Sequence, residues 1–144
     1  MNNFELDQRL KNDCLVLGRL NISLLLLMNN SLVPWFILVP ETSVIEMVDL
    51  PQSDQAALLQ EINILSAFIR GNFEITKLNI ASIGNIVSQL HVHVVGRDPS
   101  DKFWPGVVWG ASEKKPYTEE QVNRIILLIR EQLGNKFTLH YSVA

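Results

Sequence analysis

Two histidines two positions apart are the residues of this chain best placed to do chemistry. His91 and His93 stand in the segment Gln89-Leu90-His91-Val92-His93-Val94-Val95, in which the intervening residues are aliphatic. This pattern predicts a β-strand, and side chains alternate between the two faces of a strand. Gln89, His91 and His93 would therefore form one polar row, with neighbours about 7 Å apart, while the aliphatic residues face a core.

Several roles are open to this polar row: a solvent-facing sheet surface, a binding face, a metal site or a nucleophilic histidine. A metal site would need further ligands beside the two imidazoles, and a metal-binding barrel of the cupin type would supply a glutamate shortly after them. Arg97 and Asp98 stand there instead, and Cys14 is distant in the sequence. A neutral imidazole can attack phosphorus, and a protonated neighbour could offset the negative charge that develops on phosphate oxygens.

The rest of the sequence predicts a sheet that can hold this row. Stretches rich in Leu, Val and Ile, or with alternating apolar residues, predict strands at residues 14–20, 22–28, 35–39, 73–82 and 137–143. Pro40 closes the third of these strands. Residues 98–116, which contain three prolines and two tryptophans, predict a loop.

Apolar residues at helical spacing predict two main helices. The first covers residues 53–70, with Ser53 as the expected N-cap and Gly71 as the expected end. The second follows the capping box Thr118-Glu119-Glu120-Gln121. A further, short helix is expected within residues 4–13.

Length and composition fit a single domain over residues 1–144. Early strands, with helices between the later ones, predict the α+β fold class and a largely antiparallel sheet. Hydrophobic residues make up 47% of the chain, which is enough for a core, and the net charge of -3 argues against a nucleic-acid partner. One cysteine excludes an internal disulfide framework. No apolar run is long enough to span a membrane and no secretory signal is visible, so we expect a cytoplasmic protein without a membrane partner.

The histidine segment resembles the signature of the histidine triad (HIT) family, His-φ-His-φ-His-φ-φ, where φ is apolar. Trp35–Pro40 resembles the strand and proline that precede the long helix of that family. Gly84-Asn85 resembles its glycine and phosphate-side polar residue, and Trp104-Pro105-Gly106 the tryptophan-containing tail of bacterial members. The resemblance covers residues 14–110 and points to a bacterial HIT-like hydrolase branch with glutamine at the first triad position.

This resemblance implies a HIT-like α+β fold, with a central antiparallel sheet, one long helix and a C-terminal helix, in a homodimer. It implies a nucleotide hydrolase or nucleotidyl transferase that acts at the α-phosphate and has neither a metal nor a resident cofactor. His91 would be the nucleophile and carry a covalent nucleotidyl group, and His93 would contact and polarise the phosphate. Asn85 would contact the phosphate and Asn29 the ribose of a nucleotide. Trp104 would either be a core residue or pack over the nucleotide site of the neighbouring subunit.

The sequence departs from the family pattern at three positions. Gln89 stands at the first triad position, where its amide could donate to a phosphate oxygen or hold a neighbouring group but could not carry charge. Because that position supports the nucleophile, we expect Gln89→His to keep or raise activity. Glu41 and Ser43 stand where many members have basic residues, so the positive potential around the phosphates is expected to be weaker. The alternative is therefore a nucleotide-binding or interaction protein on a HIT fold with little or no turnover.

Overall fold

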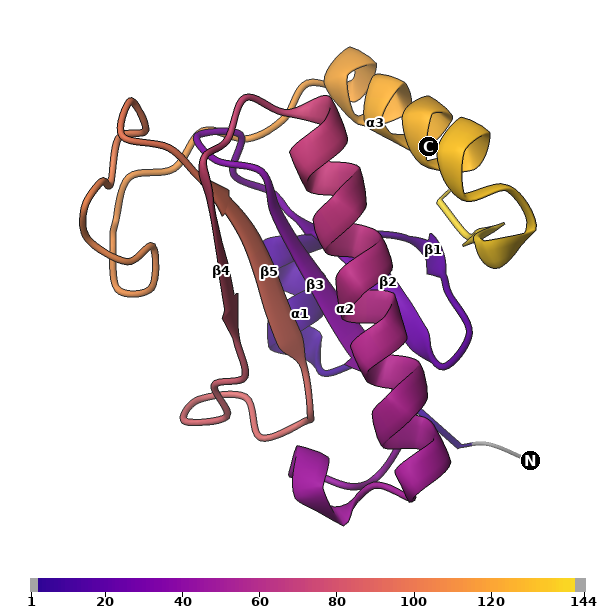
Figure 1. The fold of residues 1–144 in the computed structure, drawn as a ribbon. Coiled ribbons are helices and arrows are strands. Elements are labelled where there is room, and N and C mark those ends of the chain that lie inside the picture. The colour runs from indigo at the N-terminus through magenta and orange to yellow at the C-terminus, as the bar shows by residue number, and fades with distance from the viewer. Residues whose placement is uncertain (1–2, 142–144) are drawn as a thin grey trace.

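The computed structural model describes residues 3–141 as a sheet of six strands with three α-helices and two 3-10 turns (Figure 1). The strands are β1 (Cys14–Arg19), β2 (Ser23–Met28), β3 (Trp35–Pro40), β4 (Lys77–Ala81), β5 (Val92–Arg97) and β6 (Thr138–Leu139). The helices are α1 (Gln8–Asp13), α2 (Gln52–Asn72) and α3 (Glu119–Leu133), and the turns are η1 (Met47–Asp49) and η2 (Gly134–Lys136). The sheet order is β4-β5-β3-β2-β1-β6, and all these pairings are antiparallel. The predicted α+β fold with an antiparallel sheet, a long helix and a C-terminal helix is confirmed.

The sheet separates two clusters of buried side chains. α2 crosses one face of the sheet, and α1 lies on the other (Figure 1). Phe36 and Leu38 of β3 pack in the cluster under α2. Trp35 and Ile37 of the same strand pack in the second cluster, which includes Leu10 of α1. The alternation along β3 thus supplies side chains to both sides of the sheet.

Strand β5 alternates in the same way and places His93 on the face away from the long helix. His93 lies directly opposite Ile37 of β3, and opposite residues of an antiparallel pair share a face. The aliphatic residues that alternate with the polar ones face the other way, as predicted. Leu90, Val92 and Val94 are buried in the cluster under α2.

The strand that carries His93 begins three residues later than predicted and ends two residues later. β5 begins at Val92, so Gln89 and His91 precede the strand rather than lying on it. β3 pairs with β5 through residues 35–38 and ends at Pro40, which lacks the N–H that a further rung would use. The first two members of the polar row are therefore held by contacts outside the ladder.

Helix α2 differs from its prediction at both ends. Pro51 occupies the N-cap, where its fixed φ suits a helix start and its missing N–H is no loss. Ser53 lies inside the first turn instead of capping it, and Gly71 lies inside the last turn instead of ending it. Neither α2 nor any other helix within the described residues is long and apolar enough to cross a membrane.

The loop after β5 and helix α3 agree with their predictions. Thr118 Oγ1 accepts the Gln121 N–H, and the Gln121 side chain accepts the Thr118 N–H, which completes the capping box. Strands β4 and β6 have only five and two residues and are shorter than expected. β6 is short because it pairs only with Gly18 and Arg19 at the end of β1. Part of the predicted last strand, residues 142–143, lies outside the described residues.

Candidate active site

His91 is held just before β5 with one of its ring nitrogens committed. Its Nδ1 lies 2.7 Å from the main-chain oxygen of Gln89. Because a carbonyl oxygen only accepts, Nδ1 carries the proton of the neutral ring and Nε2 keeps its lone pair. His91 is only 5% exposed, and it lines a cleft of about 190 Å³. A lone pair beside a cleft is what a nucleophilic histidine requires.

His93 is held in the opposite tautomer. The indole Nε1 of Trp35 donates to Nδ1 of His93 at 2.9 Å. A tryptophan N–H only donates, so Nδ1 is unprotonated and the ring proton is on Nε2. Burial, followed by the charge of His91, lowers the pKa of His93 to about 4, so the ring is neutral at physiological pH. In this state His93 offers a neutral N–H donor, rather than the protonated imidazole considered from the sequence.

The two imidazoles lie next to each other in an aromatic surrounding. The ring centroids of His91 and His93 are 5.0 Å apart, with the planes inclined by 69°. The His93 ring also packs edge-on with Trp109, at 5.4 Å between centroids, and against Trp35 at 5.8 Å. The indoles shield His93 from water, while His91 reaches the cleft. Trp35 was missed by the sequence analysis, although an indole N–H within an apolar strand needs a partner and was the available signal.

The cleft beside His91 lies between the segment before η1 and the loop that joins β4 to β5. Its lining contains no lysine or arginine, and its residues are Ile45, Glu46, Ser82, Ile83, Gly84, Asn85, Ser88, Gln89, Leu90 and His91. The structure thus brings Asn85 and His91 to one cleft. Asn85 is exposed there, where its amide can donate to a bound anion.

Gln89 is engaged with a distant part of the chain. Its Oε1 accepts the main-chain N–H of Asp7, and its Nε2 donates to the main-chain oxygen of Glu5, both at 2.9 Å. These bonds occupy an acceptor and a donor of the carboxamide. The Gln89 side chain was expected either to donate to a phosphate oxygen or to hold a neighbouring group. Its contacts agree with the second role.

Comparison with known proteins agrees with this geometry. A family model described as the HIT domain matches residues 9–100. The chain belongs to the HIT domain family. Its fold matches solved histidine triad proteins from Sinorhizobium meliloti and Marinobacter aquaeolei, each 40% identical with a TM-score of 0.87, over 92% of this chain and 98% of theirs. A histidine triad protein from Bradyrhizobium japonicum is 35% identical with a TM-score of 0.86, over 90% of this chain and 97% of its own. None of the curated proteins compared with the chain matches it.

Asn29 and Trp104 do not lie beside His91 of the same chain in this HIT protein, and the expected contact of Trp104 with a neighbouring subunit stays a prediction. Asn29 Oδ1 accepts the main-chain N–H of Tyr117 at 2.9 Å. Asn29 follows the end of β2 that lies nearest the start of β3, whereas His91 lies beyond the opposite end of β3. The Trp104 ring lies over the guanidinium of Arg97, with 5.8 Å between Cζ and the ring centroid. Trp109, the other tryptophan of the loop, is the one that contacts His93.

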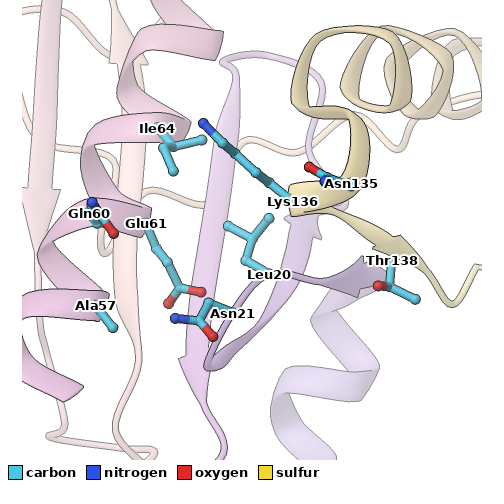
Figure 2. A pocket seen from close by; sticks show the side chains of 9 residues that line it. All are labelled: Leu20, Asn21, Ala57, Gln60, Glu61, Ile64, Asn135, Lys136 and Thr138. Carbon is cyan, nitrogen blue, oxygen red and sulfur yellow. The ribbon is translucent and has the colours of Figure 1, made fainter. Parts of the chain in front are cut away.

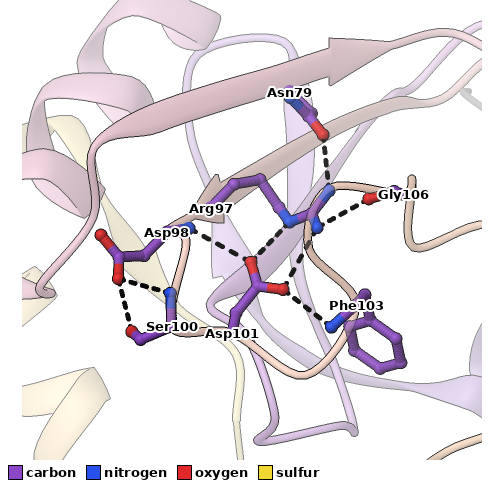
Figure 3. Close-up of polar contacts among 7 residues, drawn as sticks. All are labelled: Asn79, Arg97, Asp98, Ser100, Asp101, Phe103 and Gly106. Carbon is purple, nitrogen blue, oxygen red and sulfur yellow. Dashed lines mark hydrogen bonds and ion pairs between the residues drawn. The ribbon is translucent and has the colours of Figure 1, made fainter.

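Arg97 anchors the loop that follows β5 (Figure 3). It is 2% exposed, and its Nε and Nη2 donate to the Asp101 carboxylate at 2.8 and 3.2 Å. Nη1 donates to Asn79 Oδ1 at 2.9 Å, and Nη2 also donates to the Gly106 main-chain oxygen at 2.8 Å. Burial raises the pKa of Asp101, but the Arg97 hydrogen bond and two main-chain N–H groups outweigh it and lower that pKa. Arg97 thus stabilises the loop that carries Trp109, and its nitrogens are already engaged.

A second cavity, of about 430 Å³, lies between α2 and the C-terminal turn (Figure 2). Its buried carboxylate, Glu61, accepts hydrogen bonds from the N–H groups of Ile22 and Ser23 and from Ser23 Oγ. Glu61 therefore supports the β1–β2 turn. Within residues 3–141, no group of three or more His, Cys, Asp and Glu side chains is arranged to hold a metal ion. HIT-domain proteins are commonly nucleotide hydrolases or transferases, and the histidine pair is the part of this chain suited to that chemistry.

Proposed function

We propose that this HIT protein is a nucleotide hydrolase or nucleotidyl transferase that acts at the α-phosphate through a covalent nucleotidyl-histidine. The main support is that two adjacent imidazoles hold opposite tautomers. His91 keeps a lone pair on Nε2, and His93 carries a proton on Nε2. Phosphoryl transfer needs both functions, an attacking atom and a donor for the phosphate oxygens.

In the first step, Nε2 of His91 attacks the α-phosphorus and forms an N–P bond. The bond from phosphorus to the leaving group breaks, and the leaving group departs with the electron pair. The Nδ1 proton stays in its hydrogen bond to the Gln89 oxygen, which stabilises the cationic ring of the adduct. His93 donates its Nε2 proton in a hydrogen bond to a phosphate oxygen, where negative charge accumulates.

In the second step, water or another acceptor attacks the same phosphorus. The N–P bond breaks, its electron pair returns to Nε2 of His91, and the proton of the acceptor passes to solvent. Asn85, Ser82 and Ser88 line the cleft and supply further donors for the phosphate oxygens. Gln89 is left out of this set because its amide binds the main chain of residues 5 and 7.

We propose that the chain forms one HIT-like domain over residues 1–144 and works as a cytoplasmic homodimer of the bacterial HIT-like branch. Strand β4 is the support for the dimer. It ends the sheet on one side, so its outer main-chain groups face no other described strand, and its Ile80 is 48% exposed. Size-exclusion chromatography with light scattering at low protein concentration tests this part, and a monomer would refute it.

Turnover of adenosine phosphoramidate and of a dinucleoside polyphosphate tests the proposed activity. We expect the native chain to release a nucleoside monophosphate from both. His91→Ala should lower the rate about 10⁴-fold or more, because it removes the nucleophile. His140→Ala is the matched control: this histidine is exposed in the last described segment and should leave the rate unchanged. Equal rates for the native chain and His91→Ala would overturn the proposal.

A second function, nucleotide binding with little turnover, is favoured by the charge around the cleft. Its lining holds Glu46 and no lysine or arginine. Glu41, which follows β3, is paired with Arg19 at 3.0 Å, so the positive charge of Arg19 is already balanced by a carboxylate and attracts a polyphosphate less. Tight binding of a nucleotide to both the native chain and His91→Ala, without turnover by either, would support this function instead.

A further inference from the structure

We infer that Gln89 is a positioning residue that fastens the N-terminal segment, residues 5–9, beside the nucleophile and thereby fixes the carbonyl oxygen that orients His91. Gln89 meets His91 through its main chain and the N-terminal segment through its side chain. It therefore joins the segment just before β5 to residues of the N-terminal segment, Asp7 and Glu5, which lie 82 and 84 positions earlier in the chain. The effect on turnover rests on the proposed function, whereas the contacts belong to the resting protein.

The main-chain carbonyl group of Gln89 makes no hydrogen bond within the sheet. β5 begins at Val92, so no ladder bond holds this oxygen 2.7 Å from Nδ1 of His91. The side chain of the same residue supplies two bonds that can hold it. Oε1 accepts the Asp7 N–H and Nε2 donates to the Glu5 oxygen. The carboxamide thus pairs with the segment as one peptide group of a neighbouring strand would.

The N-terminal segment is held firmly enough to serve as an anchor. Leu6 and Leu10 are 7% and 5% exposed and pack in the cluster on the α1 face. Arg9 donates to the Asp7 carboxylate from Nε and Nη2, at 3.0 and 2.9 Å. Its Nη1 donates to the Ile86 main-chain oxygen at 2.7 Å. The segment is therefore tied both to the core and to the loop that carries Gln89.

A glutamine suits this task better than a histidine. Its amide presents an acceptor and a donor at every working pH, so both bonds persist. An imidazole is shorter, directs its nitrogens apart, and has no acceptor once it is protonated. The contacts therefore reverse the expectation drawn from the sequence: Gln89→His should release the segment and lower activity.

Nuclear magnetic resonance of the full chain without substrate tests the inference. Long-range proton–nitrogen spectra report the tautomer of His91, and amide exchange reports the Asp7 N–H. In Gln89→Leu we expect the exchange rate of the Asp7 N–H to rise about tenfold, because one hydrogen bond is lost. We also expect His91 to become a mixture of its two tautomers. We expect kcat to fall about tenfold with KM within about twofold. Gln8→Leu, which removes an exposed bond to Asn12 nearby, is the matched control and should change none of these readouts.

A second variant removes the same bond from the other side. Asp7 has φ of -54°, which suits proline, so Asp7→Pro deletes the N–H that Gln89 accepts, and Asp7→Ala controls for the lost carboxylate. The excess effect of Asp7→Pro over Asp7→Ala should vanish in the Gln89→Leu background. Full additivity, or unchanged exchange and tautomer in Gln89→Leu, overturns the inference even if His91→Ala abolishes turnover. A native chain without turnover overturns the proposed function instead, and the spectra still decide the role of Gln89.

Discussion

The indole N–H of Trp35 donates to Nδ1 of His93 at 2.9 Å, from one strand of the sheet to its neighbour. Trp35 is in register with Val95, so the bond runs diagonally between β3 and β5 on the face away from α2. Because the indole only donates, it decides which nitrogen of His93 carries the proton. The rigid sheet thus sets the chemical state of His93.

The neutral state of His93 predicts a pH dependence of stability. Burial and the charge of His91 hold the pKa of His93 at about 4 in the folded chain, below the ordinary 6.5. Between these two values the unfolded chain binds a proton on His93 and the folded chain does not. The contribution of His93 to the free energy of unfolding is therefore fully present above about pH 6.5 and is lost as the pH falls toward about 4. The loss of stability between about pH 7.5 and about pH 4.5 is about 2–3 kcal/mol, at about 1.4 kcal/mol per pKa unit.

Urea unfolding of the native chain and of His93→Asn measures this loss. The asparagine amide oxygen can accept the Trp35 N–H in place of Nδ1, and it does not titrate. We expect the free energy of unfolding of the native chain to fall by about 2–3 kcal/mol relative to the variant over that pH range. Parallel pH profiles for the two proteins would show that His93 titrates normally.

The two loop tryptophans should differ in their effect on catalysis. Trp109 packs on His93, whereas Trp104 is 39% exposed and lies on Arg97. Trp109→Ala would admit water to His93, so we expect the pKa of His93 to rise. We expect kcat/KM to fall about tenfold, because the N–H donor of His93 is no longer held in place. Trp104→Ala removes a cation–π contact of about 0.5–1 kcal/mol and should lower kcat/KM by less than about threefold. Steady-state kinetics of both variants decide this, and equal losses would contradict the assignment.

The ion pair of Arg97 and Asp101 should be the costliest one to break. The two side chains are 2% and 8% exposed, so removing one partner leaves a buried charge. We expect Asp101→Asn to lower the free energy of unfolding by about 3–5 kcal/mol. The pair of Arg124 and Glu120 is the control: its side chains are 72% and 86% exposed, and Arg124→Ala should cost less than about 0.5 kcal/mol. Denaturant unfolding of both variants gives the comparison, and a cost for Asp101→Asn as small as that of the control would be the contrary result.

Features that depend on nearby residues could be predicted from the sequence. The capping box of Thr118 and Gln121 predicts the start of α3 because all its groups lie within one turn. The spacing of His91 and His93 predicts adjacent rings for the same reason, although His91 lies just outside the strand. The family resemblance rested on this segment together with Trp35–Pro40, Gly84-Asn85 and Trp104-Pro105-Gly106, and the match to the HIT domain confirms the family.

Contacts between distant residues could not be predicted in this way. Trp35 and His93 are 58 positions apart, and a single sequence does not define the register of β3 on β5 that joins them. The partners of Gln89 lie in the N-terminal segment, whose position depends on the packing of α1. Trp109 reaches His93 because Arg97 anchors the loop, which is a property of the folded chain.

Formation of an N–P bond on His91 is the central claim, and mass spectrometry of the protein during turnover tests it most directly. The native chain is mixed with adenosine phosphoramidate, quenched in alkali to preserve the N–P bond, and mapped by peptide. We predict a mass increase of one adenylyl group on the peptide that contains His91, its retention in His140→Ala and its absence in His91→Ala. An adduct on another residue, or turnover by His91→Ala at the native rate, would contradict the claim.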